Sequence, residues 1–286
     1  MSDLQHTIKQ SVRYSGISLH TGHRAHITFK PADAGTGIII SRVDLPGKPL
    51  VEAHARNVVD VVRATTIKKG EAVVHTVEHV LAALYALGID NCLLEMDGPE
   101  PPIADGSSKP YIDILQEAGS VEQGMPRRTI VIDEPIYVEM KESRAVILPY
   151  DHYRISCTVK YGATLMDTQY MSLPVTAESF CNEMCEARTF CLYEEIAYLM
   201  NAGLIRGGSL DNAVVMKDGA IISKDGLRYP DEFVRHKMLD IVGDLSLVGC
   251  RLQGQIIAIK PGHPLNVTLA QAIVKKFQNE NDKTTS

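Results

Sequence analysis

The sequence is poor in the features that mark membrane, exported and nucleic-acid-coating proteins. It has no Trp, and its longest apolar run, residues 80–87, is far shorter than the ~20 residues that span a bilayer. Residues 1–10 carry no apolar core of the kind that a secretory signal needs. The formal net charge of −6 excludes a coat for nucleic acid, although a local basic patch can still hold a phosphate. We therefore expect a cytoplasmic protein without an integral membrane segment.

The six cysteines also lack the paired, closely spaced pattern of a structural zinc site. Cys181, Cys185 and Cys191 lie near one another in the chain, but their spacing does not form the short knuckles of such sites. Reduced thiols are expected in a chain of this length without an export signal. The ten histidines are a better source of chemistry, because imidazole binds metals and titrates near neutrality.

The length of 286 residues predicts about two domains, or one large one, at roughly 150 residues per domain. A shift of the chain by 161 residues places His79 on Asp240 and Gly88 on Gly249. Few positions match, so chance is the alternative to a true repeat. We expect an α+β fold of two similar domains, each layering helices against a β-sheet. Residues 1–122 and 129–286 form these domains, and residues 119–128 form an irregular linker.

Hydrophobic periodicity predicts the elements of both halves. Short β-rich segments predict strands in the first sixty residues, at 91–96, at four places between 129 and 159, and at 254–260. A hairpin is expected around residues 218–219 because Asp-Gly favours a tight turn. Three- and four-residue spacing of apolar residues predicts five helices, at 71–87, 110–117, 177–201, 231–247 and 265–277.

The first of these helices carries a candidate catalytic motif. His75, Glu78 and His79 are three and four residues apart, so on a helix they share one face. Zinc-assisted hydrolysis needs this combination, because imidazole holds the ion and a carboxylate accepts a proton from water. The same H-x-x-E-H spacing occurs in inverted zinc proteases, so a protease is an alternative. A solvated helix face is the simpler alternative.

The helix at 231–247 carries a second candidate motif. His236, Asp240 and Asp244 are spaced by four residues and line one face. One His from the first helix and a His/Asp pair from this one would form a three-ligand zinc site with an open position. An exposed ladder of ion pairs is the alternative, as in a domain pair without enzymatic activity. His263 lies on a loop before the last helix, where it can act as a general acid or simply belong to a turn.

Six segments resemble, in order, the family of UDP-3-O-acyl-N-acetylglucosamine deacetylases, the zinc amidases of bacterial lipid A synthesis. They are His-Thr-Val-Glu-His at 75–79, Asp-Gly-Ser-Ser at 105–108, Ala-Arg-Thr-Phe at 187–190, Gly-Gly-Ser-Leu-Asp-Asn-Ala at 207–213, the long segment 231–245, and Gly-His-x-x-Asn at 262–266. The resemblance extends from the N-terminal strands to the last helix. It implies an active site between the two domains and zinc held by His79, His236 and Asp240, with His75 outside the site.

The resemblance also implies the catalytic roles. Glu78 would be the base that activates water, and His263 would be the acid that protonates the leaving amine. Asp244 would orient or tune His263, and Thr189 would stabilise the tetrahedral oxyanion.

The substrate implied by the resemblance is a UDP-acyl-sugar. Separately, we expect the protein to be a monomer. Lys237 would lie toward the diphosphate, while Phe190 and an insert at 191–223 would line an apolar passage for the acyl chain. The family often has a Phe platform for uracil near a Phe-Asn-His-Pro stretch. That stretch is not kept here, and Tyr161 is the candidate in its place. Lys141 is a further candidate contact for the phosphates.

Overall fold

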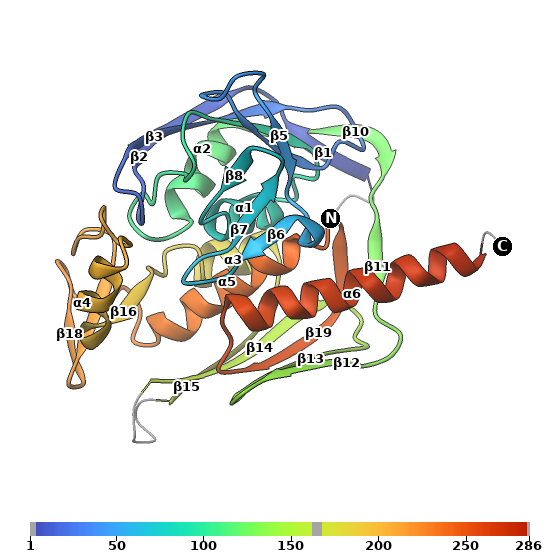
Figure 1. The fold of residues 1–286 in the computed structure, drawn as a ribbon. Helices are drawn as coiled ribbons and strands as arrows, with labels where there is room; N and C mark the ends of the chain where they lie inside the picture. The colour runs from blue at the N-terminus through green and yellow to red at the C-terminus, as the bar shows by residue number, and fades with distance from the viewer. Residues whose placement is uncertain (1–3, 162–167, 285–286) are drawn as a thin grey trace.

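Two open sheets enclose a double layer of helices (Figure 1). The computed structural model describes residues 4–161 and 168–284, with side chains up to residue 277. The first sheet has the strand order β2-β3-β9-β4-β5, and the second has the order β12-β13-β19-β14-β15 with β11 beside β19. The strands of the first sheet are β2 (Val12–Ile17), β3 (Arg24–Pro31), β9 (Cys92–Met96), β4 (Ile38–Arg42) and β5 (Leu50–Glu52). Those of the second are β12 (Ile136–Met140), β13 (Ser143–Leu148), β19 (Arg251–Ile259), β14 (Tyr153–Lys160), β15 (Thr168–Pro174) and β11 (Thr129–Val131).

The two sheets share one topology. In each sheet the central strand, β9 or β19, runs antiparallel to the strand on one side and parallel to the strand on the other. Each outer pair is antiparallel. In each half one main helix directly precedes the central strand and another follows it, α1 (Glu78–Ala86) and α2 (Lys109–Ala118) around β9 and α5 (Glu232–Ser246) and α6 (His263–Thr284) around β19. The expected α+β fold of two similar halves is therefore confirmed, while the domain boundaries at 122 and 129 stay a prediction.

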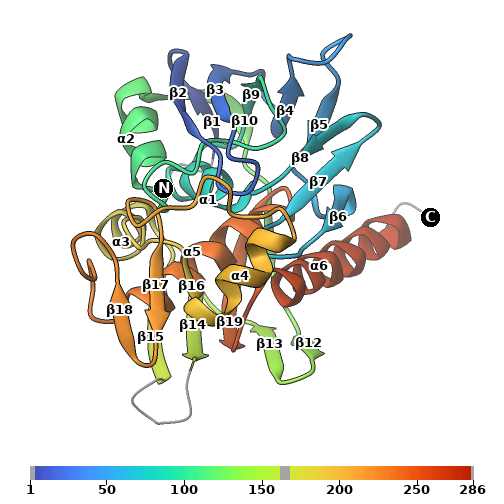
Figure 2. The ribbon, with the colours of Figure 1, turned by 60° about the vertical axis from the view of Figure 1, so that its left-hand side comes forward.

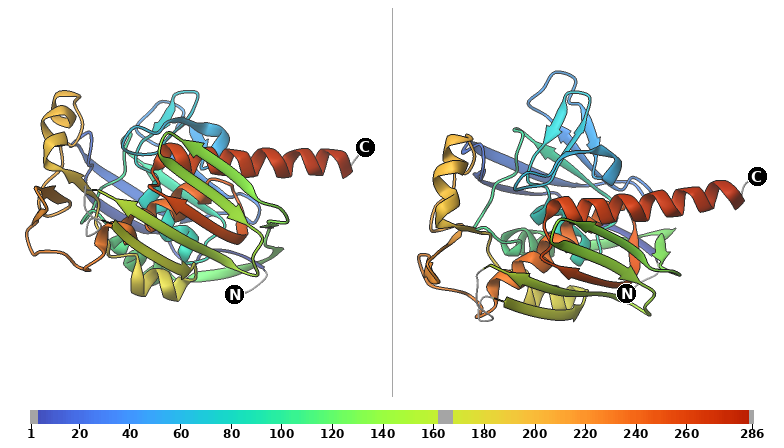
Figure 3. Two further views of the ribbon diagram at one scale, coloured as in Figure 1. Left: turned by 90° about the horizontal axis from the view of Figure 1, so that it is seen from below. Right: turned by 60° about the horizontal axis from the view of Figure 1, so that its bottom comes forward.

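The helices meet in the middle of the molecule. The matching helices α1 and α5 pack directly against each other, α2 packs on β2, and α6 packs on β12 and β13. Figure 3 shows α6 crossing the second sheet and extending past its edge. Among the described residues, no helix combines the length and apolar character that crossing a bilayer takes.

Two smaller units complete the fold. A three-stranded sheet of β6 (Val58–Asp60), β7 (Thr66–Lys69) and β8 (Ala72–Val74) follows the 3-10 turn Ala55–Asn57 in the first half. The second half has the short helix α3 (Ala177–Glu183) and an insert of β16 (Phe190–Leu192), α4 (Tyr193–Asn201), β17 (Val214–Lys217) and β18 (Ala220–Ile222). The expected hairpin around residues 218–219 is confirmed as β17–β18. Figure 2 shows α4 in front of α1 and α5.

Three expected segments differ from the structure. The helix expected from residue 71 begins only at Glu78, because residues 66–74 form the β7–β8 hairpin, closed at Gly70 with a φ of 58°. The helix expected over 177–201 is broken, because residues 190–192 pair with β17. The expected irregular linker contains β10 (Ser120–Pro126), which pairs with β1 (Leu4–Ile8). Nearly all of β10 is exposed, so it lacks the alternation by which a half-buried strand is recognised.

Candidate active site

The site forms where the beginning of α1 meets the middle of α5. Gly243 makes this approach possible, because a Cβ at that position would lie 2.1 Å from the Glu78 carbonyl oxygen. The close packing buries Glu78, His79 and Asp240, with at most 5% of each residue exposed. The polar positions of both helices therefore face each other rather than water, and the alternatives of a solvated helix face and an exposed ion-pair ladder are wrong.

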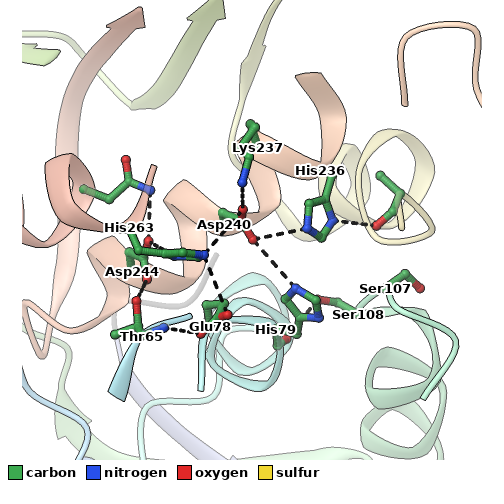
Figure 4. Close-up of polar contacts among 12 residues, drawn as sticks. Thr65, Glu78, His79, Ser107, Ser108, His236, Lys237, Asp240, Asp244 and His263 are labelled. Atoms are coloured by element: carbon green, nitrogen blue, oxygen red, sulfur yellow. Dashed lines mark hydrogen bonds and ion pairs between the residues drawn. The ribbon is translucent and has the colours of Figure 1, made fainter. Parts of the chain in front are cut away.

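One cluster at this contact has the composition of a metal site. The Nε2 atoms of His79 and His236 lie 3.7 and 3.5 Å from Oδ1 of Asp240 (Figure 4). Ligand atoms of all three residues lie within 4.8 Å of one another. Within the part of the chain that the structure describes, Oδ1 of Asp240 is buried without a hydrogen-bond partner. A buried, unpaired carboxylate oxygen is costly, so two imidazoles and this oxygen fit a cation.

The surroundings prepare these three side chains for a cation. A carbonyl can only accept, so Nδ1 of His236 must donate its proton to the Ala187 carbonyl, 3.0 Å away, which leaves Nε2 free. Burial lowers the pKa of His236. Burial and the neighbouring His236 lower the pKa of His79 to about 3, so its ring is neutral. Although burial opposes it, Lys237 and His236 lower the pKa of Asp240 and keep it charged.

A second buried cluster, formed by the titratable side chains of Glu78, Asp244 and His263, lies beside the first. Nδ1 of His263 lies 2.9 Å from Oδ2 of Asp244, and its Nε2 lies 3.8 Å from Oε1 of Glu78. Asn266 donates to the same Asp244 oxygen at 2.9 Å. Thr65 joins the two carboxylates, because its hydroxyl donates to Asp244 at 2.6 Å and its backbone N–H donates to Glu78 at 3.0 Å. Asp244 therefore fixes the Nδ1 side of the His263 ring, while Nε2 is directed toward Glu78.

The two titratable groups of this cluster have shifted pKa values with different causes. Burial raises the pKa of Glu78 to about 7, although His263 opposes the shift. Burial alone would lower the pKa of His263, but Asp244, Glu78 and Asp240 outweigh it and raise the pKa to about 9. Near pH 8 the pair therefore holds an ionised carboxylate beside a protonated imidazole, which suits one base and one acid.

Both clusters open into one cavity of about 420 Å³. Its lining includes both clusters' reactive side chains and the loop that follows β6. Thr189 and Phe190 form part of the wall, together with Lys237. A larger groove of about 1000 Å³ lies between the other ends of α1 and α5, but neither cluster faces it. The smaller cavity is therefore the candidate active site.

The remaining residues singled out from the sequence take different places. Phe190 packs against Tyr161, with ring centroids 4.9 Å apart, and Nζ of Lys237 lies 5.4 Å from the Phe190 ring centroid. Tyr161 thus stands behind the wall rather than in it. Lys141 lies in the exposed turn between β12 and β13 and does not line the cavity.

His75 does not share a face with Glu78 and His79. It precedes α1, its backbone N–H donates to the Pro99 carbonyl, and its Nδ1 lies 3.0 Å from the Thr66 hydroxyl. The helical placement that we expected for it is wrong, because the chain is still leaving the β7–β8 hairpin at this point. Its ring is outside both clusters and does not line the cavity.

Sequence reasoning missed several supporting residues. Thr65 stands in no motif, and only the tertiary fold brings it to Glu78 and Asp244. Ser108 belongs to the Asp-Gly-Ser-Ser segment, for which we predicted no role. Its hydroxyl donates to the His79 carbonyl at 2.8 Å. Asn266 likewise lies within the Gly-His-x-x-Asn segment and donates to Asp244. Its position three residues after His263 was the available signal for this place.

Comparison with known proteins identifies the family of the chain. The family model for UDP-3-O-acyl N-acetylglycosamine deacetylase (LpxC) matches residues 5–275. A UDP-3-O-acyl-N-acetylglucosamine deacetylase of Citrifermentans bemidjiense is 45% identical over 95% of this chain and 89% of its own length. One of Chlamydia muridarum is 41% identical over 97% of both chains. The bifunctional enzyme LpxC/FabZ of Chlorobaculum tepidum is 39% identical over 97% of this chain and 65% of its own length. The chain therefore belongs to the UDP-3-O-acyl N-acetylglycosamine deacetylase family.

Proposed function

We propose that the protein is a zinc-dependent deacetylase of the bacterial cytoplasm. It removes the N-acetyl group of UDP-3-O-acyl-N-acetylglucosamine and releases acetate, a step of lipid A synthesis. The observation that carries the proposal is the pair of adjoining buried clusters, one suited to a cation and one to proton transfer, in a single cavity. The names of the relatives supply the substrate.

The residues that would hold zinc are His79, His236 and Asp240. Neutral imidazoles and an unpaired carboxylate oxygen are a donor set that zinc prefers. Bound zinc supplies a Lewis acid for the amide carbonyl and lowers the pKa of water from 15.7 to about 7.

Glu78 is the base in this proposal. Its pKa of about 7 lies near neutrality, where a carboxylate can accept a proton from water and later release it. The Thr65 N–H holds one carboxylate oxygen, so the other remains available toward the cavity.

His263 is the acid that protonates the amine nitrogen as the C–N bond breaks. An amine must be protonated to leave, and Asp244 keeps the imidazole charged and correctly oriented for this transfer. Thr189 would donate to the developing oxyanion. Its backbone N–H donates to the Gly106 carbonyl and its carbonyl accepts from Val214, so its position is fixed from both sides.

The substrate contacts follow from the cavity wall. Phe190 and the insert at 191–223 would line a passage for the acyl chain, since exposed apolar side chains such as Tyr193 and Tyr198 lie on α4. Lys237 would meet the polar part of the substrate at the cavity wall. Tyr161 packs against Phe190 and does not line the cavity, so its place as a uracil platform stays a prediction from the resemblance. Lys141 stays a prediction from the resemblance, without support from the cavity.

The inverted zinc protease is the weaker candidate. It needs His75 and His79 as joint ligands, and His75 is bonded elsewhere, before the helix begins.

The proposal is tested by acetate release from UDP-3-O-acyl-N-acetylglucosamine. We expect turnover by the zinc-loaded protein, loss on chelation and recovery on adding zinc back. Stoichiometric zinc without acetate release would refute the substrate, and undiminished turnover after complete metal removal would refute the zinc dependence.

A further inference from the structure

An ion pair joins the insert to the first half of the molecule at the rim of the cavity. Nη1 and Nη2 of Arg63 contact Oε2 and Oε1 of Glu195 at 3.1 and 2.5 Å. The contact is bidentate, which fixes orientation as well as distance. Arg63 lies on the loop between β6 and β7, and Glu195 lies in the first turn of α4, so the pair links segments 132 residues apart.

Each partner of this pair is also tied to the site on its own side. Arg63 lines the cavity and stands two residues before Thr65, which holds Glu78 and Asp244. Glu195 also accepts from the Leu192 N–H at 3.3 Å, so it caps α4 directly after β16, the strand that begins with Phe190.

The backbone of Arg63 is held in an unusual conformation. Its φ of 65° lies in the left-handed region, which residues other than Gly rarely adopt. Such a conformation persists where surrounding contacts enforce it, and the bidentate pair is one such contact. The pair therefore joins a strained loop on one side of the cavity to the beginning of α4 on the other.

We propose that Arg63 and Glu195 form a clamp that fixes α4 as the wall of the acyl passage and so sets the preference for long acyl chains. This role rests on the proposed function. Both residues are positioning residues, since they act through α4 and β16 rather than on the reacting atoms.

The kinetic test compares substrates that differ only in the acyl chain. Acetate release is measured from UDP-N-acetylglucosamine carrying a tetradecanoyl or a butanoyl group on O3. In Arg63→Ala and Glu195→Gln we expect KM for the long-chain substrate to rise about threefold to fivefold, as an exposed ion pair allows. In Glu195→Gln, which changes no residue of the cavity lining, we expect kcat and the short-chain KM to stay within twofold of wild type. Glu195→Gln is useful because its amide oxygen can still cap α4.

Two further variants separate the ion pair from backbone and folding effects. Arg63→Gly suits the left-handed conformation but removes the charge, so it should behave like Arg63→Ala. In the double variant Arg63→Ala/Glu195→Gln, KM for the long-chain substrate should rise no more than in either single variant, because both changes remove the same contact. Lys30→Ala is the matched control, since Lys30 and Glu95 form a similarly exposed pair on the first sheet, with side chains 39% and 27% exposed.

Amide hydrogen exchange tests the clamp independently of the substrate. We expect faster exchange in residues 190–201 of Arg63→Ala and Glu195→Gln, with the thermal unfolding midpoint unchanged. Unchanged exchange there, together with a wild-type long-chain KM, would overturn the clamp even if wild type deacetylates both substrates. An equal loss on both substrates would also overturn it, because the pair would then act on the catalytic centre rather than on the passage.

Discussion

At the scale of single residues, neighbours give two buried carboxylates opposite properties. Asp240 is surrounded by cationic and imidazole groups that lower its pKa despite burial, so it is a permanent anion. Glu78 has fewer such neighbours, and burial raises its pKa to about 7. The first suits a ligand, which must be deprotonated, and the second suits a base that exchanges a proton.

Replacing Glu78 by Gln tests this division of roles. The amide keeps the size of the side chain but cannot take a proton, so we expect acetate release to fall about 10²–10⁴-fold. Zinc content should stay near that of wild type, because the ligands are untouched. Steady-state kinetics and metal analysis of the same sample measure both. A variant with near-normal turnover would show that another group is the base.

The pH profile tests the pair of Glu78 and His263. Activity requires an ionised Glu78 and a protonated His263, so kcat/KM should rise through about pH 7 and fall through about pH 9. The two limbs are properties of the coupled pair. In Asp244→Asn the alkaline limb should move to lower pH, because Asp244 is the foremost group that raises the pKa of His263. An alkaline limb that does not move would exclude His263 as the acid.

Motifs in the sequence were sufficient to predict the reactive residues of the site, but not the residues that hold them in place. Helical spacing predicted one His of the first helix together with His236 and Asp240, and the family resemblance selected His79. The structure places these three together; that they bind zinc stays a prediction. Thr65 could not be found, because its two hydrogen bonds depend on how the β6–β7 loop meets α1 and α5. The Arg63–Glu195 pair could not be predicted either, because it joins residues that are 132 positions apart in the chain.

At the scale of elements, the α1–α5 contact determines the geometry of the site. Both helices are almost wholly buried at the contact, and Gly243 lies against the backbone of Glu78. A helix interior ordinarily disfavours Gly by about 1 kcal/mol relative to Ala, so close approach explains this residue better than helix propensity does.

Gly243→Ala tests this contact. The added methyl group would overlap the Glu78 carbonyl, so the helices must separate. We expect a loss of about 1–3 kcal/mol in the free energy of unfolding, typical of overpacking, together with weaker zinc binding. Chemical denaturation and zinc titration measure these. Gly98→Ala is the control, because a Cβ there meets no atom within 4 Å. Unchanged stability in Gly243→Ala would mean that the helices adjust freely.

Element boundaries were predictable where a local signal such as an Asp-Gly turn or a helical repeat marks them, and failed elsewhere. The hairpin of β17–β18 and the helix α5 lie close to their expected positions. The break between α3 and α4 was missed because residues 190–192 pair with the distant strand β17. Glu232 also anchors the segment before them, since it accepts from both the backbone and the side chain of Arg188. Such a long-range contact leaves no trace in local periodicity.

At the scale of the whole molecule, the site depends on both halves. α1 of the first half supplies His79 and Glu78, and α5 of the second supplies His236 and Asp240. The weak repeat that aligns His79 with Asp240 corresponds to the shared sheet topology and to the packing of α1 on α5. A cation held by these ligands would therefore also link the two halves.

The most direct test of this account is the zinc content of two purified variants, His236→Ala and His75→Ala. We predict that His236→Ala loses stoichiometric zinc, because it removes a ligand contributed by the second half. We predict that His75→Ala keeps one zinc per chain, because His75 lies outside the cluster. Zinc retained by His236→Ala and lost from His75→Ala would contradict the shared site and favour the protease-like ligand set.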